Sequence, residues 1–224
     1  MPPGALESGL EEGQGKQSRK TSCRMAGVVL AAGESRRMGQ AKQLLSAGGE
    51  ILLARALRAA LNACLEPVVL VLGFESDRIV SSLGSLRDHP KLRLVENPRY
   101  REGMSTSLIA GLSVVEEDRD FIMVLLGDMP HVTPGLINRL CEETMASGCP
   151  LGAVTVRGRR SLPVVIGRPL YAEVRRLTGD VGARSLFQRH PDRVCRVETG
   201  SEYDDADVDT PEDLARFRCE SLDR

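Results

Sequence analysis

A stretch of small and positively charged residues, LAAGESRRMGQAKQLL, runs from Leu30 to Leu45 directly after a short apolar segment. Small side chains let backbone N–H groups approach a ligand closely and form a nest for an anion, and here they belong to Ala31, Ala32 and Gly33. Fixed positive charge follows at Arg36, Arg37 and Lys42. The stretch matches neither a P-loop nor the G-x-G-x-x-G pattern. It is therefore either a phosphate-binding loop of another kind or a solvated basic turn.

An acidic residue, Asp128, follows a second apolar segment in LLGDMP, residues 125–130. A carboxylate in this position suits Mg²⁺, which binds few protein carboxylates and shares its other sites with phosphate oxygens and water. The alternative is a turn residue that caps the next helix, since Asp and Pro are both common in turns. Thr133, followed by a proline, is the better helix cap. The sequence therefore favours Asp128 as a metal ligand.

A second acidic stretch, DADVDTPEDL, covers residues 205–214. Aspartates alternate with other residues at 205, 207 and 209, so in an extended segment their side chains point to one side. Asp209 is the candidate for a second metal ligand, with Asp207 as the alternative. The other interpretation is a solvated acidic loop that leads into a helix with Thr210 as its N-cap.

The elements that could position these residues alternate between short apolar runs and helix-like segments. Strands are predicted at 27–32, 66–73, 91–97 and 121–128, and helices at 51–64, 75–86, 104–115 and 133–146. This alternation is typical of right-handed crossovers and of a parallel sheet covered on both faces. We therefore expect a three-layer α/β fold with a mostly parallel twisted sheet. Because ligands bind at the carboxyl ends of such strands, the basic loop and Asp128 should share one edge.

The second half of the chain has a looser pattern, which we interpret as a small β elaboration on the substrate side. Strands are predicted at 151–158 and 161–167 around a charged turn, RGRRS, and Pro163 indicates an edge strand or a bulge. Helices near 169–177 and 182–189, a strand at 192–198 and a last helix after Thr210 complete the chain. Residues 1–24 have the composition of a disordered extension, which leaves a single domain over 25–224.

Composition argues against several classes of protein. The net charge is −1, aromatic residues make up 3% of the chain and Trp is absent, whereas nucleic-acid-binding proteins need basic surfaces and stacking platforms. The 6 cysteines include no C-x-x-C pair and are expected to be reduced thiols of a cytoplasmic protein. No run approaches the roughly 18 apolar residues of a membrane helix, so no membrane partner is expected.

The order of the motifs resembles a known family. LAAGESRRMG followed by Lys42, then NPRYREGMSTSL, LLGDMP, GRR followed by a proline, and DVDTPEDL are similar to the motifs of the MobA-like nucleotidyltransferases, above all the molybdenum cofactor cytidylyltransferase branch. The resemblance covers residues 25–217. It implies a Rossmann-like nucleotidyltransferase fold. It also implies an enzyme that joins a nucleoside monophosphate to a phosphorylated acceptor and releases pyrophosphate.

The resemblance implies a role for each matching residue. Catalytic roles fall to Arg37, Lys42 and Asp128, with Arg36 as the alternative to Arg37, because this chemistry needs positioning and charge stabilisation more than a covalent catalyst. Mg²⁺ would be held by Asp128 and Asp209. The nucleotide-binding set comprises Leu30, Ala31, Ala32, Gly33, Arg36, Lys42, Asn97, Gly103, Ser105 and Ser107. The last four of these would lie along the pocket for the base and the acceptor.

The acceptor half departs from the family pattern. The implied acceptor-binding residues are Arg159, Arg160, Leu162 and Pro163. Leu162 stands where the cytidylyltransferase branch has His, and a polar acceptor group facing Leu would lose a hydrogen bond. An exposed turn is the alternative for the two arginines.

The implied partners are a nucleotide and an acceptor. The nucleotide is CTP, favoured over GTP or another NTP by the Ala31–Ala32 pair, and the acceptor is of molybdopterin type, with a molybdoenzyme or its chaperone as a further partner. Rival acceptors are a sugar phosphate or another phosphorylated metabolite. A non-catalytic carrier of nucleotide or molybdenum cofactor is the rival of another class. A full set of Arg37, Lys42, Asp128 and Asp209 argues against the carrier.

Overall fold

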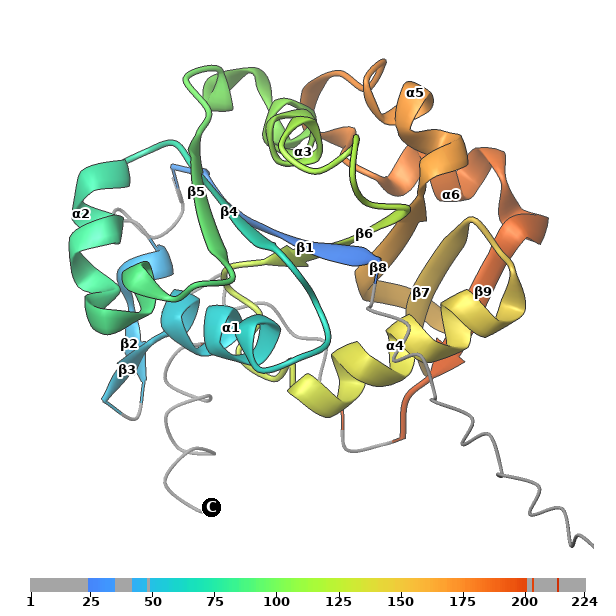
Figure 1. Ribbon diagram of the computed structural model, residues 1–224, viewed down its shortest axis with the longest axis horizontal. Coiled ribbons are helices and arrows are strands. Elements are labelled where there is room, and N and C mark those ends of the chain that lie inside the picture. Colours follow the sequence, from blue (N-terminus) through green and yellow to red (C-terminus); the bar gives the residue numbers. More distant parts are fainter. Residues whose placement is uncertain (1–23, 35–41, 48, 201–202, 204–212, 214–224) are drawn as a thin grey trace, which may run out of the picture.

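The protein is built around one large twisted sheet with helices on both faces (Figure 1). The computed structural model describes residues 24–34, 42–47, 49–200, 203 and 213. Apart from Arg24 and Asp213, the expected extension at 1–24 and the expected last helix lie outside these residues. Within them, no helix is both long and apolar enough to cross a membrane.

In the described part of the chain, the main sheet has seven strands in the order β5-β4-β1-β6-β8-β7-β9. Their bounds are β1 Met25–Ala31, β4 Val68–Leu72, β5 Leu92–Glu96, β6 Phe121–Leu126, β7 Leu151–Val156, β8 Arg159–Gly167 and β9 Val194–Glu198. Only β8 runs antiparallel to its neighbours, which confirms the predicted mostly parallel sheet. A separate two-stranded ribbon pairs β2 Ser46–Ala47 with β3 Glu50–Ile51.

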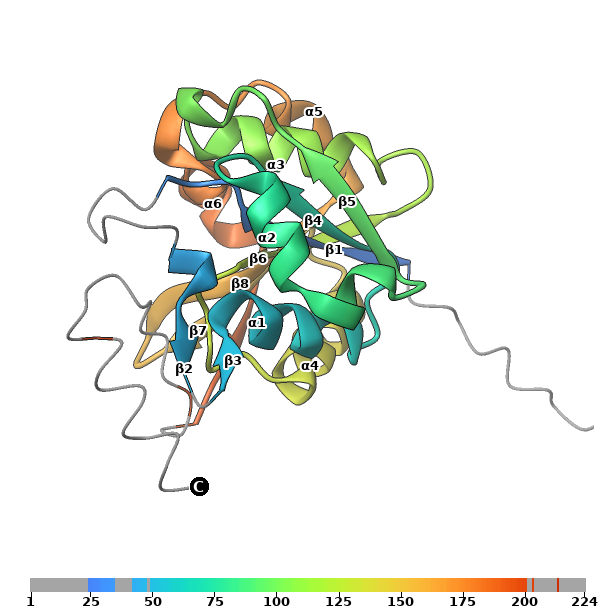
Figure 2. The ribbon, with the colours of Figure 1, turned by 90° about the vertical axis from the view of Figure 1, so that its left-hand side faces the viewer.

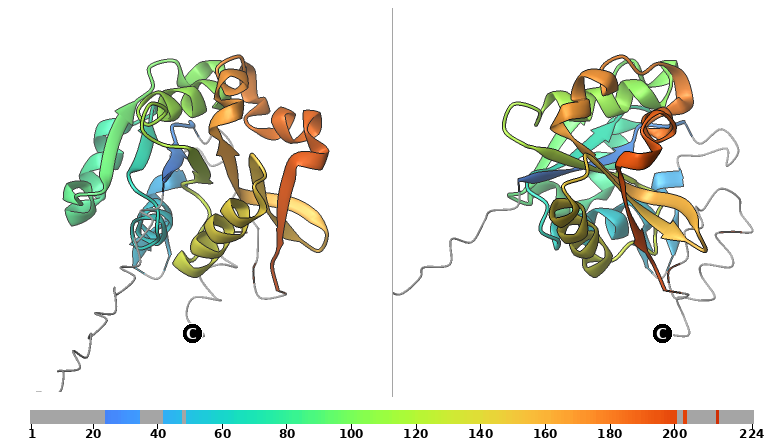
Figure 3. Two further views of the ribbon diagram at one scale, coloured as in Figure 1. Left: turned by 45° about the vertical axis from the view of Figure 1, so that its right-hand side comes forward. Right: turned by 90° about the vertical axis from the view of Figure 1, so that its right-hand side faces the viewer.

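Helices cover both faces of the sheet (Figures 2 and 3). One face carries α1 Leu52–Leu61, α2 Ser76–Ser82 and α4 Pro134–Ser147, and the other carries α3 Met104–Ser113, α5 Tyr171–Val174 and α6 Arg184–Arg189. Short 3₁₀ turns occupy η2 Lys42–Leu44, η3 Gly84–Asp88, η4 Tyr100–Glu102, η5 Arg168–Leu170, η6 Gly179–Val181 and η7 Pro191–Arg193.

Burial on both faces explains why the central strands are continuous apolar runs. All seven residues of β1 are buried, and the neighbours Val28 and Val29 belong to different apolar clusters on opposite faces. Each such side chain removed from water stabilises the fold by about 1.5–3 kcal/mol. Gly111 lets α3 lie close against the sheet, since a Cβ there would stand 2.4 Å from Val28 Cγ1. This packing fixes the start of α3 near the carboxyl ends of the strands.

The hairpin between β7 and β8 corrects two predictions. Its turn is only Arg157 and Gly158, whose φ angles of 51° and 74° suit a two-residue hairpin. Arg159 and Arg160 therefore belong to β8 rather than to an exposed turn. Pro163 lies in an interior strand, at a register shift opposite Ala153 and Val154, so the bulge interpretation holds and the edge interpretation is wrong.

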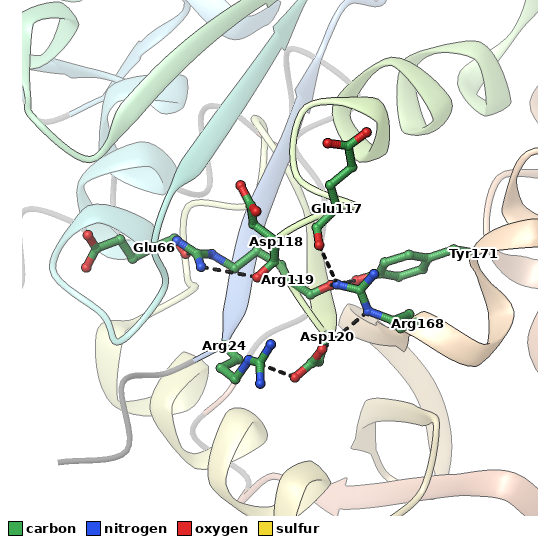
Figure 4. Close-up of polar contacts among 8 residues, drawn as sticks. All are labelled: Arg24, Glu66, Glu117, Asp118, Arg119, Asp120, Arg168 and Tyr171. Carbon is green, nitrogen blue, oxygen red and sulfur yellow. Dashed lines mark hydrogen bonds and ion pairs between the residues drawn. The ribbon is translucent and has the colours of Figure 1, made fainter. Parts of the chain in front are cut away.

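A polar network connects several elements at the amino end of β6, next to Phe121 (Figure 4). Asp120 forms ion pairs with Arg24 Nε at 2.9 Å and with Arg168 Nε at 3.3 Å. Arg168 also donates to the Arg119 carbonyl at 2.9 Å, and Tyr171 Oη donates to the same carbonyl at 3.2 Å. Burial raises the pKa of Tyr171, so its hydroxyl remains a neutral donor. The network joins the starts of β1 and β6 to α5. It therefore lies at the end of the sheet opposite the carboxyl ends of β1 and β6.

Candidate active site at the carboxyl ends of the strands

Two loops leave the sheet side by side where β1 and β6 end. Leu30 of β1 is in register with Leu126 of β6, and the Gly127 N–H donates to the Leu30 carbonyl at 3.0 Å. Gly127 must be small, because a Cβ there would lie 2.8 Å from Leu53 Cδ1. The loop that begins with Ala32 and Gly33 therefore starts next to Asp128, as the sequence predicted for the edge of a parallel sheet.

A close ion pair links Lys42 to the buried Asp128. Lys42 Nζ, on η2, contacts Asp128 Oδ2, and the Asp128 side chain is only 7% exposed. The other oxygen, Oδ1, is buried and has no hydrogen-bond partner among the residues that the structure describes. A buried carboxylate oxygen without a partner is costly, and a cation would satisfy it. The carboxylate oxygen at this position is therefore a suitable ligand for a divalent cation.

Gln43 fixes the loop and was not predicted. The residue is 4% exposed, and its side-chain Nε2 donates to the carbonyls of Ala31 at 3.4 Å and Gly33 at 3.2 Å. Phe74 N–H donates to the intervening Ala32 carbonyl at 3.1 Å. The protein therefore holds three successive carbonyls at the start of the loop. A glutamine next to a lysine gives no sequence signal for this role.

Asn97 and Ser107 connect the end of β5 to α3 through a hydrogen bond between their side chains. Both residues were expected at the pocket for the base and the acceptor. The Asn97 side chain is buried, and its Nδ2 donates to Thr106 Oγ1 and to Ser107 Oγ, each at 2.9 Å. Asn97 Oδ1 accepts from the Arg99 N–H at 3.0 Å. Both amide hydrogens are thus used inside the protein. The geometry makes Asn97 a positioning residue for the start of α3.

Gly103 and Asp180 attach η6 to the start of α3. Gly103 has a φ of 114°, and a Cβ on it would lie 2.3 Å from the Gly179 carbonyl carbon. Asp180 Oδ1 accepts from the Met104 N–H at 3.0 Å and so caps this end of the helix. Ser105, in the first turn, is fully buried, and its hydroxyl has no partner within the described part of the chain. The lack of a side chain at Gly103 therefore allows η6 to pack closely against the start of α3.

A pocket of about 610 Å³ opens beside this edge, between the sheet, α3 and α6. Its apolar lining includes Leu30, Leu108, Leu126, Leu162 and Phe187. Its charged lining is Arg160, Asp180 and Arg184. The Arg160 guanidinium carbon lies 4.6 Å from the centre of the Phe187 ring. Burial lowers the pKa of Arg160, and the positive charges of Arg184 and Arg196 lower it further.

The other predicted residues lie in several different places. Leu30, Arg160 and Leu162 line the pocket, whereas Arg159 is exposed and Pro163 is not part of the lining. Lys42 and Asp128 pair at the sheet edge. The predicted Arg36, Arg37, Asp207 and Asp209 lie outside the described residues. Of the residues that are described, no three His, Cys, Asp or Glu side chains are grouped so as to hold a metal ion.

Comparisons with known proteins agree with this architecture. The model of the MobA-like NTP transferase domain matches residues 27–194. Purine catabolism protein PucB of Bacillus subtilis is 31% identical over 87% of this chain and 96% of its own length. The molybdenum cofactor cytidylyltransferase of Escherichia coli is 23% identical over 84% of this chain and 92% of its own length.

A solved structure extends the comparison to a metal complex. Rv0371c of Mycobacterium tuberculosis in complex with manganese superimposes with a TM-score of 0.70 at 28% identity, covering 86% of this chain and 97% of that one. The family match spans both the loop after β1 and the pocket-lining segment up to β9. From its sequence, its sheet and its site, the chain belongs to the MobA-like NTP transferase family.

Proposed function

We propose that this NTP transferase moves CMP from CTP to a molybdopterin-type phosphorylated acceptor and releases pyrophosphate. The observation that carries the proposal is that Leu126 and Met129, which flank Gly127 and Asp128 in the chain, line the pocket, so that it lies close to the Lys42–Asp128 pair. The pocket walls are largely apolar, which suits a fused-ring organic phosphate better than a sugar phosphate, whose hydroxyl groups need many polar partners. The Escherichia coli relative carries the matching activity in its name.

The nucleotide half of the reaction rests on the loop after β1. Backbone N–H groups around Ala32 and Gly33 bind the triphosphate, and Gln43 keeps this part of the loop in place. Lys42 and Arg37, with Arg36 as the alternative to Arg37, neutralise charge as the reaction proceeds. An oxygen of the acceptor phosphate forms a bond to the α-phosphorus of CTP. The bond between the α- and β-phosphates breaks, and pyrophosphate leaves with the bonding electrons.

Mg²⁺ fits the acidic side of the site. Asp128 would hold it, together with Asp209 or with Asp207 as the alternative, and the buried Asp128 Oδ1 is the atom that supports this assignment. The bound ion would supply positive charge to the phosphate oxygens. The manganese complex of Rv0371c is consistent with a divalent cation in this family.

The nucleobase and the acceptor occupy the side of the site that α3 borders. Asn97 positions the start of α3 through its bonds to Thr106 and Ser107. The Ala31–Ala32 pair resembles that of the pyrimidine-using members of the family, which supports CTP as the nucleotide. Arg160 and Leu162 face the acceptor from β8.

An assay of pyrophosphate release tests both halves of the proposal. The purified chain is supplied with Mg²⁺, Mo-molybdopterin and each of the four NTPs in turn. We expect turnover with CTP and with none of the other three NTPs. Turnover with GTP but not with CTP would refute the nucleotide assignment. With CTP held constant, glucose 1-phosphate replaces Mo-molybdopterin in a second series. Turnover with the sugar phosphate but not with Mo-molybdopterin would refute the acceptor assignment.

A further inference from the structure

Three arginines come from neighbouring elements at one end of the sheet: Arg160 from β8, Arg184 from α6 and Arg196 from β9. Figures 1 and 3 show these three elements close together. Arg160 on β8 is paired with Thr155 of β7, and Arg196 on β9 is paired with Ala153 of β7. Side chains alternate along a strand, and Val194 packs with the cluster on this face, so Arg196 points to the same face. Arg184 comes from α6 itself and lines the pocket with Arg160.

None of these three guanidinium groups forms an ion pair with any residue that the structure describes. The contrast on α6 is clear, because Arg189 Nη1 lies 2.9 Å from Glu173 Oε2. The nearby carboxylate of Asp180 accepts from the Met104 N–H instead. Like charges that form no ion pair repel one another, and the pKa of Arg160 falls through burial and through the charges of the other two arginines. An anion would relieve this repulsion.

The surroundings of the arginines define the kind of anion. Phe187 supports the Arg160 guanidinium from one side at 4.6 Å, which orients its planar fork. Guanidinium groups of this kind bind phosphate through paired charge-assisted hydrogen bonds. The adjoining pocket wall is apolar, with Leu108, Leu126 and Leu162. An apolar pocket with a cationic end suits an organic phosphate.

We infer that Arg160, Arg184 and Arg196 form one anion site, which holds the phosphate monoester of the acceptor at the α6 side of the pocket. The inference rests on the proposed function and adds Arg184 and Arg196 to the acceptor site. Val124 of β6 is in register with Val164 of the antiparallel β8, and β6 ends two residues later at Leu126, so the start of β8, including Arg160, extends past the end of β6. Arg160 therefore lies toward the edge that carries Asp128. A phosphate held there is on the side where the nucleotide binds.

A binding experiment tests the anion site without any nucleotide. Phenyl phosphate is the probe, since its ring suits the apolar wall and its phosphate suits the arginines. Calorimetric titration of the full chain compares Arg184→Gln and Arg196→Gln with Arg176→Gln, an exposed arginine outside the pocket lining that loses the same charge. We expect each of the first two variants to bind phenyl phosphate about tenfold more weakly, as for the loss of one charge-assisted hydrogen bond. The control should bind it as the unaltered chain does.

In the binding experiment, two results would overturn the inference: unchanged affinity in both variants, or no saturable binding of phenyl phosphate by the unaltered chain. Kinetics with CTP and Mo-molybdopterin separate this inference from the proposed function. In both variants KM for Mo-molybdopterin should rise while KM for CTP stays constant. Turnover with an unchanged KM for Mo-molybdopterin would overturn the arginine site and leave the proposed function intact. If the chain showed no turnover with Mo-molybdopterin but bound phenyl phosphate in a way that depended on the arginines, the assignment of a molybdopterin-type acceptor would be refuted. The same result would support the anion site.

Discussion

Replacement of Gln43 by Met tests how the phosphate loop is held. The variant keeps the length of the side chain and removes the donor that bonds the carbonyls of Ala31 and Gly33. Two lost hydrogen bonds of ~1 kcal/mol each reduce the free energy of unfolding by about 2 kcal/mol. For a chain of this size that corresponds to a fall in Tm of about 4–8 °C. Because the loop start is no longer fixed, we also expect KM for the NTP to rise.

The measurements are thermal unfolding and initial rates of pyrophosphate release at several NTP concentrations. Gln188→Met is the matched control, since Gln188 is exposed on α6, and it should change neither value. If Gln43→Met had the Tm and the KM of the unaltered chain, the structural role derived for Gln43 would be wrong. A lower Tm with an unchanged KM would limit that role to stability and refute the link to nucleotide binding.

Three further predictions concern other parts of the molecule. Gly103→Ala should lower the free energy of unfolding by at least ~1–3 kcal/mol, because φ is 114° and the new Cβ would meet Gly179; denaturation of Gly84→Ala, where φ is 55° but space is open, gives the comparison. Because the pKa of Tyr171 is raised in the folded protein, the unfolded chain loses the hydroxyl proton of this residue first as pH rises. The free energy of unfolding should therefore fall above about pH 10, and it should fall less in Tyr171→Phe. Denaturation curves with the same pH dependence in both proteins would contradict this. Leu162→His should lower KM for Mo-molybdopterin, and an unchanged KM would count against a contact between this position and the acceptor.

The strands that are most predictable are those in the middle of the sheet, where helices cover both faces. β1, β4 and β6 are buried between two layers, so their sequences are apolar without interruption and their positions follow within a few residues. The start of α4 also follows from sequence, because Thr133 Oγ1 accepts from the Leu136 N–H at 3.2 Å as an N-cap should. Local chemistry decides both features.

The hairpin of β7 and β8 shows where local patterns fail. The charged letters RGRRS indicate a long turn, but two residues with positive φ close it, and pairing with β7 holds the following arginines in a strand. Pro163 is accepted in an interior strand because a register shift absorbs it. The pairing of β7 with β8 determines both features, and the sequence of one segment alone does not reveal that pairing.

The candidate site divides in the same way. Lys42 and Asp128 could be placed together from sequence, because the carboxyl ends of adjacent parallel strands share one edge. Gln43, Asp180 and Arg184 could not, since each acts through contacts made by the folded chain rather than through a motif. The roles of Arg37 and Asp209 remain predictions.

The central claim is that Asp128 supports nucleotidyl transfer at the sheet edge. The most direct measurement is the rate of pyrophosphate release from CTP by Asp128→Asn, with Mg²⁺ and Mo-molybdopterin present. Asp118→Asn, an exposed acid at the opposite end of β6, is the control, and unfolding curves establish that both variants fold. We predict that Asp128→Asn reduces turnover by ~100-fold or more, as for loss of a preorganised charge at the reacting phosphates, while the control retains full activity. Near-normal turnover by folded Asp128→Asn would contradict the account.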